Sequence, residues 1–296
     1  MKKTVFKGVA TALITPFTDD TKNVDFDGFG RLIEFQINNR ADALVISGTT
    51  GESPVLSKEE KIALFREAVK CVDGKIPVIA GTGSNNTDEA VRKSNDAEKE
   101  GVDGLLIVTP YYNKCTTEGL IRHYFYIADR VSTPVIVYNV PARTGVSVSP
   151  EAYKALSEHK NIVAVKEASS DISYFIKAKA LCGNDIDFYS GNDDLAVSMM
   201  SHGAKGVISV ASNIIPDILH RITGLCINND FENAHILHEK YLKLMNLMFC
   251  EVNPIPIKYA CSMLFGTNNN LRLPLTPITR EKAEKLRDLL KAYKLI

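Results

Sequence analysis

The chain has 296 residues, of which 45% are hydrophobic and 24% are charged. That composition is ordinary for a soluble globular protein, and the chain is long enough to bury a large core. Lys plus Arg and Asp plus Glu both total 35, so the formal net charge is zero. This balance excludes a bulk electrostatic attraction to nucleic acid or to an anionic membrane, and any anionic substrate must be bound by a few local cations.

The sequence shows no pattern typical of a secreted or membrane protein. No apolar run approaches the ~20 residues that a membrane-spanning helix needs, and the first residues lack the long apolar stretch of a signal peptide. None of the six cysteines belongs to a CxxC pair, which in a chain of this length favours reduced thiols over disulfides. We therefore expect a cytoplasmic protein without a membrane partner.

Eight short apolar runs recur along the first 210 residues and predict β-strands. Most are rich in Val and Ile and show no polar alternation, as expected for parallel strands that are covered on both faces. The runs span residues 9–14, 43–46, 76–80, 105–108, 135–138, 162–165, 186–189 and 206–210.

The stretches between the runs carry signals for the starts of helices. Asp25 precedes a helical pattern of phenylalanines and isoleucines. Ser57 and Glu60 have the spacing of a capping box, and Ser149 followed by Pro150 gives an N-cap and a proline at the first helical position. Strand and helix signals therefore alternate along this part of the chain.

Eight strand–helix units at this spacing predict an α/β fold of the (β/α)8 type, a TIM barrel. An open doubly wound sheet is the alternative. Its GxGxxG fingerprint is absent, because Gly81-Thr82-Gly83 lacks the third glycine.

The strand pattern stops after residue 212. Helices are predicted from there on, over residues 231–249, 255–265 and 279–293. We therefore predict a barrel over residues 1–225 and a C-terminal helical extension over residues 226–296.

Lys166 is the most informative candidate for chemistry, because the active site of such a barrel lies at the carboxyl ends of its strands. Lys166 follows the sixth run and should lie at the mouth of the barrel. A deprotonated, buried lysine can attack a carbonyl carbon and form a Schiff base. The alternative is a structural ion pair between Lys166 and either Glu167 or another acid.

Hydroxyl groups follow three other runs. Tyr138 ends the fifth run, Thr49 follows the second and Tyr112 follows the fourth. Three hydroxyls in a chain can relay a proton to or from a Schiff-base intermediate. Taken singly, each of these residues is more often structural.

Two features are suited to binding carboxylates. Arg143 lies five residues after Tyr138, and its planar guanidinium matches a carboxylate, although a surface arginine is the alternative. The backbone amides of Gly48 and Gly51 can hold a small carboxylate.

Other kinds of catalytic site find little support in the sequence. His235 and His238 are three residues apart on a predicted helix, but no third metal ligand accompanies them, so a solvated helix face is the better interpretation. Neither a GxSxG nucleophile motif nor a P-loop occurs.

Four motifs together resemble the dihydrodipicolinate synthase and N-acetylneuraminate lyase superfamily over essentially the whole chain. Each motif alone is weak to moderate, and their combination is highly specific. They are GTTGE at 48–52, TPYYN at 109–113, YNVPARTG at 138–145 and VKEAS at 165–169.

Three further features resemble the synthases of this superfamily more than the lyases. They are Thr49-Thr50, Arg143-Thr144-Gly145 and the tail segments 253–258 and 271–277. Ala142 departs from the glycine or serine that is usual at its position, and we expect little effect because alanine is small.

The resemblance implies a lyase that joins pyruvate to L-aspartate 4-semialdehyde by a class I aldol condensation. The product would be 4-hydroxy-tetrahydrodipicolinate, in the biosynthesis of diaminopimelate and lysine. Lys166 would form the Schiff base with pyruvate. Thr50, the backbone at Ile208 and Gly191 would bind pyruvate, and Arg143 would hold the carboxylate of the semialdehyde.

The resemblance also implies a proton relay and an assembly. Tyr138, Thr49 and Tyr112 would convert the imine to an enamine. The family is usually a homotetramer built from tight dimers, in which Tyr112 would reach into the neighbour's site and Tyr111 would stack across the interface. No organic cofactor, no metal ion and no nucleic acid partner is implied.

Two alternatives stay open at this point. One is a related pyruvate-dependent aldolase or lyase that acts on a 2-keto-3-deoxy sugar acid or on N-acetylneuraminate, which would not need Arg143. The other is a catalytically silent barrel that only binds pyruvate or a partner, and the presence of Lys166 and Tyr138 argues against it.

The resemblance further implies an effector site for L-lysine at the dimer interface. Lys58 and Lys61 bring positive charge to positions where lysine-regulated members have residues such as histidine, so we expect weak or absent inhibition by L-lysine. The positions that match this site are Ser53, Pro54, Lys58, Lys61, Asn85, Glu89 and Tyr111.

Overall fold

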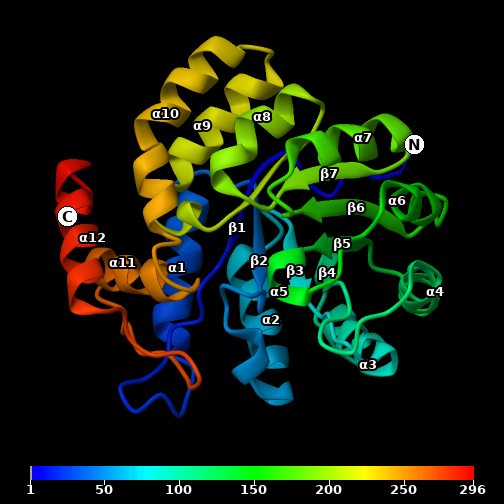
Figure 1. Cartoon of the computed structure of the whole chain (residues 1–296). Helices are drawn as coiled ribbons and strands as arrows, with labels where there is room; N and C mark the ends of the chain where they lie inside the picture. Colours follow the sequence, from blue (N-terminus) through cyan, green and yellow to red (C-terminus); the bar gives the residue numbers. More distant parts are fainter. Residues whose placement is uncertain (1) are drawn as a thin grey trace.

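In the computed structural model, which describes residues 2–296, eight parallel strands pair in chain order and close into a barrel (Figure 1). β1 pairs with β2 on one side and with β8 on the other, and this last pairing closes the sheet. The strands are β1 Gly8–Ala12, β2 Ala43–Ile46, β3 Val78–Gly81, β4 Gly104–Val108, β5 Val135–Asn139, β6 Ile162–Glu167, β7 Asp187–Ser190 and β8 Gly206–Ser209.

Helices alternate with the strands and surround the barrel (Figure 1). Within residues 2–296, none of them is both long enough and apolar enough to cross a membrane. The α-helices are α1 Phe26–Asn38, α2 Lys58–Val72, α3 Thr87–Lys99, α4 Thr117–Ala128, α5 Pro141–Thr144, α6 Pro150–Ser157, α7 Ile172–Cys182, α8 Ala196–Ser201, α9 Pro216–Ile227, α10 Phe231–Leu247, α11 Ile255–Phe265 and α12 Arg280–Ala292. Short 3-10 turns are η1 Ser53–Val55, η2 Asp193–Leu195 and η3 Ala211–Asn213.

Each of the eight apolar runs overlaps a strand, so the predicted (β/α)8 barrel is confirmed. The bounds differ where local chemistry decides them. Pro77 has no amide hydrogen to give to the sheet, and β3 starts only at Val78. β6 continues past its apolar run and includes Lys166 and Glu167, so these two side chains are fixed by sheet pairing rather than carried on a loop.

A pair of glycines closes the barrel. Gly8 of β1 pairs with Gly206 of β8, and a Cβ atom at Gly206 would lie 1.9 Å from the carbonyl oxygen of Gly8. A side chain at Gly206 would therefore force the first and last strands apart.

The core has two layers. One cluster of apolar side chains fills the barrel, and a larger one lies between the barrel and its helices. Phe6, just before β1, stacks on Tyr189 of β7 with ring centroids 4.1 Å apart, and the Tyr189 hydroxyl donates to the Phe6 carbonyl at 2.7 Å. The interior of the barrel is therefore packed with side chains, and a barrel of this kind has its active site at the open end of that interior.

The predicted helix starts are confirmed. The Asp25 side chain accepts from the amide of Gly28 at the start of α1. Ser57 and Glu60 form a capping box at the start of α2, and Ser149 caps α6 with Pro150 at its first position.

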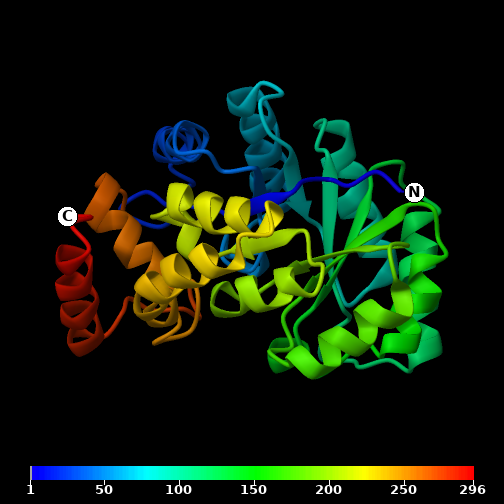
Figure 2. The ribbon, with the colours of Figure 1, turned by 90° about the horizontal axis from the view of Figure 1, so that it is seen from above.

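The three helices predicted for the C-terminal region are confirmed as α10, α11 and α12, with slightly shorter ends for the first and last. They lie on the opposite side of the barrel from α4, α6 and α7 (Figures 1 and 2). α9, which packs on β1, was not predicted, although Pro216 and Asp217 at its start were a signal for it. The division at residues 225 and 226 falls in the last turn of α9 and stays a prediction.

Candidate active site

Lys166 and Tyr138 lie side by side at the carboxyl ends of β6 and β5, where they occupy the same register position. The exposed fraction is 6% for Lys166 and 8% for Tyr138. The ammonium nitrogen of Lys166 lies 4.4 Å from the centroid of the Tyr138 ring. The two residues predicted to lead the chemistry are therefore neighbours.

Glu167 does not pair with Lys166, so the alternative of a structural ion pair between them is wrong. Successive side chains of a strand point to opposite faces, and Glu167 points away from Lys166 toward the helices. Its carboxylate accepts from the Tyr153 hydroxyl at 2.6 Å, the Asn139 amide at 3.1 Å and the backbone amide of Ser169 at 2.7 Å. Across residues 2–296, Lys166 forms no ion pair with any carboxylate.

The contacts of Glu167 fix the strand ends that carry the candidate pair. Asn139 and Glu167 occupy the register position that directly follows Tyr138 and Lys166. Their buried hydrogen bond joins β5 to β6 on the outer face of the sheet, so Tyr138 and Lys166 are held level with each other on the inner face.

A small cavity of about 70 Å³ lies over Lys166. Thr49, Thr50, Arg143 and Gly191 line it together with Lys166 and Tyr138, so most of the predicted site residues meet there. Its complete lining is Ala12, Val45, Gly48, Thr49, Thr50, Leu106, Tyr138, Val140, Arg143, Lys166, Ala168, Gly191, Asn192, Val210, Phe249 and Asn253.

Gly191 allows the end of β7 to approach the lysine. A Cβ atom on Gly191 would lie 2.6 Å from the Cβ of Ala168 and 3.2 Å from the Cε of Lys166. The amide of Gly191 donates to the Glu167 carbonyl at 2.7 Å. A larger residue here would displace Lys166 or fill the cavity.

Two predicted residues are not brought to this cavity. Ile208 is buried in the barrel on β8, and the cavity wall on that side is Val210. Tyr112 is 90% exposed and has a left-handed backbone, with φ of 70°. No direct hydrogen bond within the described residues joins the hydroxyls of Thr49 and Tyr138. The roles of these residues stay predictions.

Asn253, in the tail segment 253–258, lies at the site although no role was predicted for it. Its side-chain amide donates to the Thr50 hydroxyl at 3.0 Å, and its backbone carbonyl accepts from the Arg143 guanidinium at 3.1 Å. It thus joins the two residues predicted to bind substrate carboxylates. The side-chain oxygen of Asn253 is buried and has no partner within residues 2–296.

The predicted solvated helix face is confirmed for His235, whose side chain is exposed, but it is wrong for His238, which is buried. His235 pairs with Glu239 at 3.3 Å on the helix surface, while His238 contacts the Asp193 carbonyl at 2.9 Å. No group of three or more His, Cys, Asp or Glu side chains in the described part of the chain is arranged to hold a metal ion.

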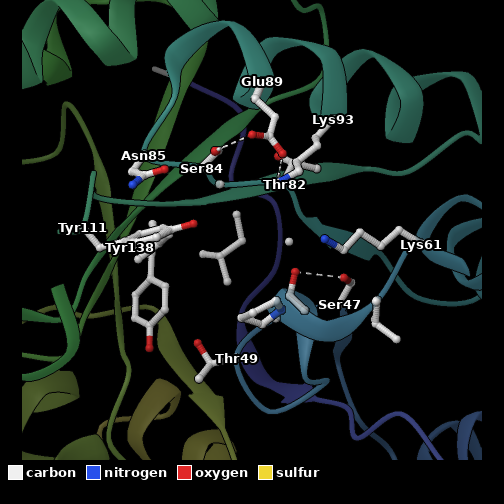
Figure 3. Close-up of a pocket in the computed structure, with 18 of the residues that line it drawn as sticks. Ser47, Thr49, Lys61, Thr82, Ser84, Asn85, Glu89, Lys93, Tyr111 and Tyr138 are labelled. Carbon is white, nitrogen blue, oxygen red and sulfur yellow. Dashed lines mark hydrogen bonds and ion pairs between the residues drawn. The ribbon is translucent and has the colours of Figure 1, made fainter. Parts of the chain in front are cut away.

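A second cavity of about 690 Å³ opens beside the first (Figure 3). Thr49, Tyr138 and Arg143 line both cavities. All seven residues matched to the effector site line the larger one.

Five cationic and two acidic side chains line this larger cavity, and both acids already have partners. Lys58 lies 2.9 Å from Asp96, and Lys93 lies 2.7 Å from Glu89. Lys61 extends toward the middle of the cavity (Figure 3). Burial, together with the nearby charge of Lys93, lowers the pKa of Lys61 to about 8, and Glu89 and Glu60 oppose this shift.

Comparison with known proteins agrees with this geometry. The model of the dihydrodipicolinate synthetase family matches residues 5–293. A 4-hydroxy-tetrahydrodipicolinate synthase of Geobacter metallireducens is 47% identical over 292 residues, which are 99% of this chain and 100% of the relative.

Two crystal structures illustrate the similarity in fold. The chloride-inhibited dihydrodipicolinate synthase of Acinetobacter baumannii complexed with pyruvate has a TM-score of 0.97 at 39% identity, covering 99% of this chain and 100% of that one. The enzyme of Cyanidioschyzon merolae with lysine bound has a TM-score of 0.96 at 38% identity, with the same coverage. The match of the family model over nearly the whole chain and the 47% identity place this chain in the dihydrodipicolinate synthetase family.

Proposed function

We propose that the protein condenses pyruvate with L-aspartate 4-semialdehyde to give 4-hydroxy-tetrahydrodipicolinate, with Lys166 as the Schiff-base nucleophile. The observation that carries the proposal is the buried amine of Lys166, which faces a cavity of about 70 Å³ beside Tyr138 and has no carboxylate partner in residues 2–296. The names of the relatives support the choice of reaction, and the Acinetobacter structure contains pyruvate.

The first half of the reaction forms a nucleophile from pyruvate. The neutral Lys166 amine attacks the keto carbon of pyruvate, and water leaves to give an iminium ion. Loss of a proton from the methyl group then gives an enamine. Tyr138 lies beside the amine, and Thr49 lines the same cavity, so both are placed to move these protons.

The second half joins the substrates and frees the lysine. The enamine carbon attacks the aldehyde carbon of the semialdehyde and forms a hydroxyl group. The amino group of the same substrate then attacks the iminium carbon, and the ring closes as Lys166 leaves. Arg143 is the cation that lines the cavity besides Lys166, and its fork suits the carboxylate of the second substrate.

The alternative that acts on sugar acids has less support. Arg143 is held at the cavity by Asn253, where it can bind the single carboxylate of an amino-acid aldehyde, and the relatives carry the name of the synthase. A coupled assay with pyruvate and aspartate semialdehyde tests the proposal. Cleavage of N-acetylneuraminate or of a 2-keto-3-deoxy sugar acid, without formation of the dihydrodipicolinate precursor, would replace it with the alternative.

The proposal includes a homotetramer built from tight dimers. Tyr112, at 90% exposure, lies outside the cavity of its own chain, which supports a role in a neighbouring site. Sedimentation velocity tests this assembly. A monomer that keeps full activity, or a Tyr112→Phe variant with unchanged activity, would contradict it. Location in the cytoplasm stays a prediction.

A further inference from the structure

A second buried lysine lies outside the cavities described above. Lys258 of α11 has a side chain that is 0% exposed, and its nitrogen lies 2.5 Å from a carboxylate oxygen of Glu52, which is 1% exposed. Burial lowers the pKa of Lys258 to about 8, although Glu52 opposes that shift. The pair joins the C-terminal extension to the turn that carries Thr49 and Thr50.

Arg272 completes this contact. Its backbone amide donates to the second carboxylate oxygen of Glu52 at 3.1 Å, and its guanidinium binds the Glu60 carboxylate at 2.6 and 2.7 Å. The Phe17 ring lies near both cations, 3.9 Å from the Lys258 nitrogen and 4.3 Å from the Arg272 guanidinium carbon. We call Glu52, Lys258 and Arg272 the charged cluster.

The backbone at Glu52 has a conformation that a side chain rarely adopts. Its φ is 55°, in the left-handed region, and its amide donates to the Thr49 carbonyl at 3.1 Å. Gly51 just before it is tightly enclosed, because a Cβ there would lie 3.1 Å from the Leu13 carbonyl oxygen. Such a conformation persists when its surroundings determine it, and both oxygens of Glu52 are bound by the extension.

The extension holds the same turn at a second point. Asn253, five residues before Lys258, donates to the Thr50 hydroxyl. Thr50 therefore receives its hydrogen bond from the same segment that anchors Glu52. Two contacts on one short turn fix its orientation as well as its position.

Stability alone does not account for the charged cluster. Removing two charges from water is costly, and replacing a buried ion pair by apolar groups of similar size is often neutral or stabilising. Such a pair is better suited to selecting one arrangement of the chain. The element that it selects here is the turn whose threonines line the cavity.

We propose that Glu52, Lys258 and Arg272 are positioning residues, through which the C-terminal extension holds the 48–52 turn so that Thr49 and Thr50 face the cavity beside Lys166. The inference rests on the proposed function for its consequence, which is the orientation of pyruvate for attack. The charged cluster acts through the turn and does not itself touch the substrate.

The double variant Glu52→Gln, Lys258→Met tests the proposal, because it removes both charges and nearly keeps both shapes. We expect the variant to remain folded, and the rate of trapping pyruvate with borohydride to fall roughly tenfold to a hundredfold, the size of effect caused by a misplaced catalytic element. The KM for pyruvate should rise, while the KM for aspartate semialdehyde should change less. Arg287→Met is the matched control, because Arg287 contacts Tyr259 within the extension and should leave all three values unchanged.

Hydrogen exchange of the peptide around residues 48–56 gives a readout that does not depend on activity. Exchange in this peptide should increase in the double variant and not in the Arg287 control. If the double variant does not fold, Glu52→Gln alone provides the same two measurements. Unchanged exchange together with an unchanged trapping rate would overturn the proposal. Absence of any pyruvate adduct in the unaltered protein would overturn the proposed function instead, and exchange would still decide whether the cluster holds the turn.

Discussion

Lys166 and Lys258 are two buried lysines in one molecule with different surroundings. Each ammonium lies over an aromatic ring, at 4.4 Å from the centroid for Tyr138 and 3.9 Å for Phe17. Lys258 has a carboxylate at 2.5 Å, whereas Lys166 has no such partner within residues 2–296 and borders a cavity. Burial alone therefore does not distinguish the two lysines, and our proposal of Lys166 as the nucleophile rests on its missing counterion together with the adjoining space.

The difference follows from the elements that carry the two residues. Lys166 ends a strand, so the alternation of side chains points the neighbouring acid away from it. Lys258 lies on α11, whose packing against the barrel brings the acid of a distant turn to it. The acid adjacent in the sequence is unavailable to Lys166, and the acid that pairs with Lys258 comes from 206 residues away.

Lys166→Ala gives the largest effect that we expect. Without the amine no imine with pyruvate forms, and activity should fall by at least about a thousandfold, in the range seen when a catalytic nucleophile is removed. Borohydride with pyruvate, followed by peptide mapping, checks this in the unaltered protein. An adduct on Lys258 or another lysine would show that Lys166 is not the nucleophile.

Tyr138→Phe should have the next largest effect. The ring beside Lys166 remains, but the hydroxyl that we propose to move protons is lost, so kcat should fall roughly a hundredfold or more. Trapping of the pyruvate imine at equilibrium should persist. Comparable kcat values for the variant and the unaltered protein would remove Tyr138 from the proton relay.

Arg143→Ala should damage the use of aspartate semialdehyde more than the formation of the imine. Charge-assisted hydrogen bonds contribute roughly 1.5–3 kcal/mol, so kcat/KM for the aldehyde should fall about ten- to a hundredfold. Lys177→Ala on α7 is a suitable control for loss of a cation. The role would be contradicted if kcat/KM for the aldehyde stayed at its original value.

The smallest effect that we expect concerns Lys61, a third lysine, which is partly buried and lines the larger cavity. Inhibition by L-lysine should be weak at pH 7, because Lys61 is then charged and repels a cationic ligand in the larger cavity. Its pKa is lowered to about 8, so Lys61 loses its charge as the pH rises through this value, and inhibition should become stronger between pH 7 and pH 9.

Titration of L-lysine into the coupled assay at both pH values measures this effect. The Lys61→Met variant should be inhibited by L-lysine more readily than the unaltered protein at pH 7. We expect a gain in affinity for L-lysine of about tenfold, which corresponds to ~1.4 kcal/mol. Half-inhibition at sub-millimolar L-lysine in the unaltered protein at pH 7 would show that Lys61 does not oppose the ligand.

The barrel and the centre of the site could be predicted because both depend on local patterns. Apolar runs mark strands, and a residue that ends a run or directly follows it lies at the mouth of the barrel, which is why Tyr138 and Lys166 could be predicted there. The partners that hold them could not be predicted in the same way. Asn253 reaches Thr50 across 203 residues, and no periodicity in the sequence records which distant segment packs on a given turn.

The separation between Glu52 and Arg272, 220 residues along the chain, also sets an order of events during synthesis. At ribosomal rates of about 5–20 residues per second, roughly 10–45 s pass between the two residues. All eight strands are made before Arg272 is added to the chain. During that time, the turn that carries Thr49 and Thr50 has no C-terminal extension to bind. A nascent barrel would thus contain Lys166 before the turn is held in place, and its reaction with pyruvate would stay slow until α11 and Arg272 have been made.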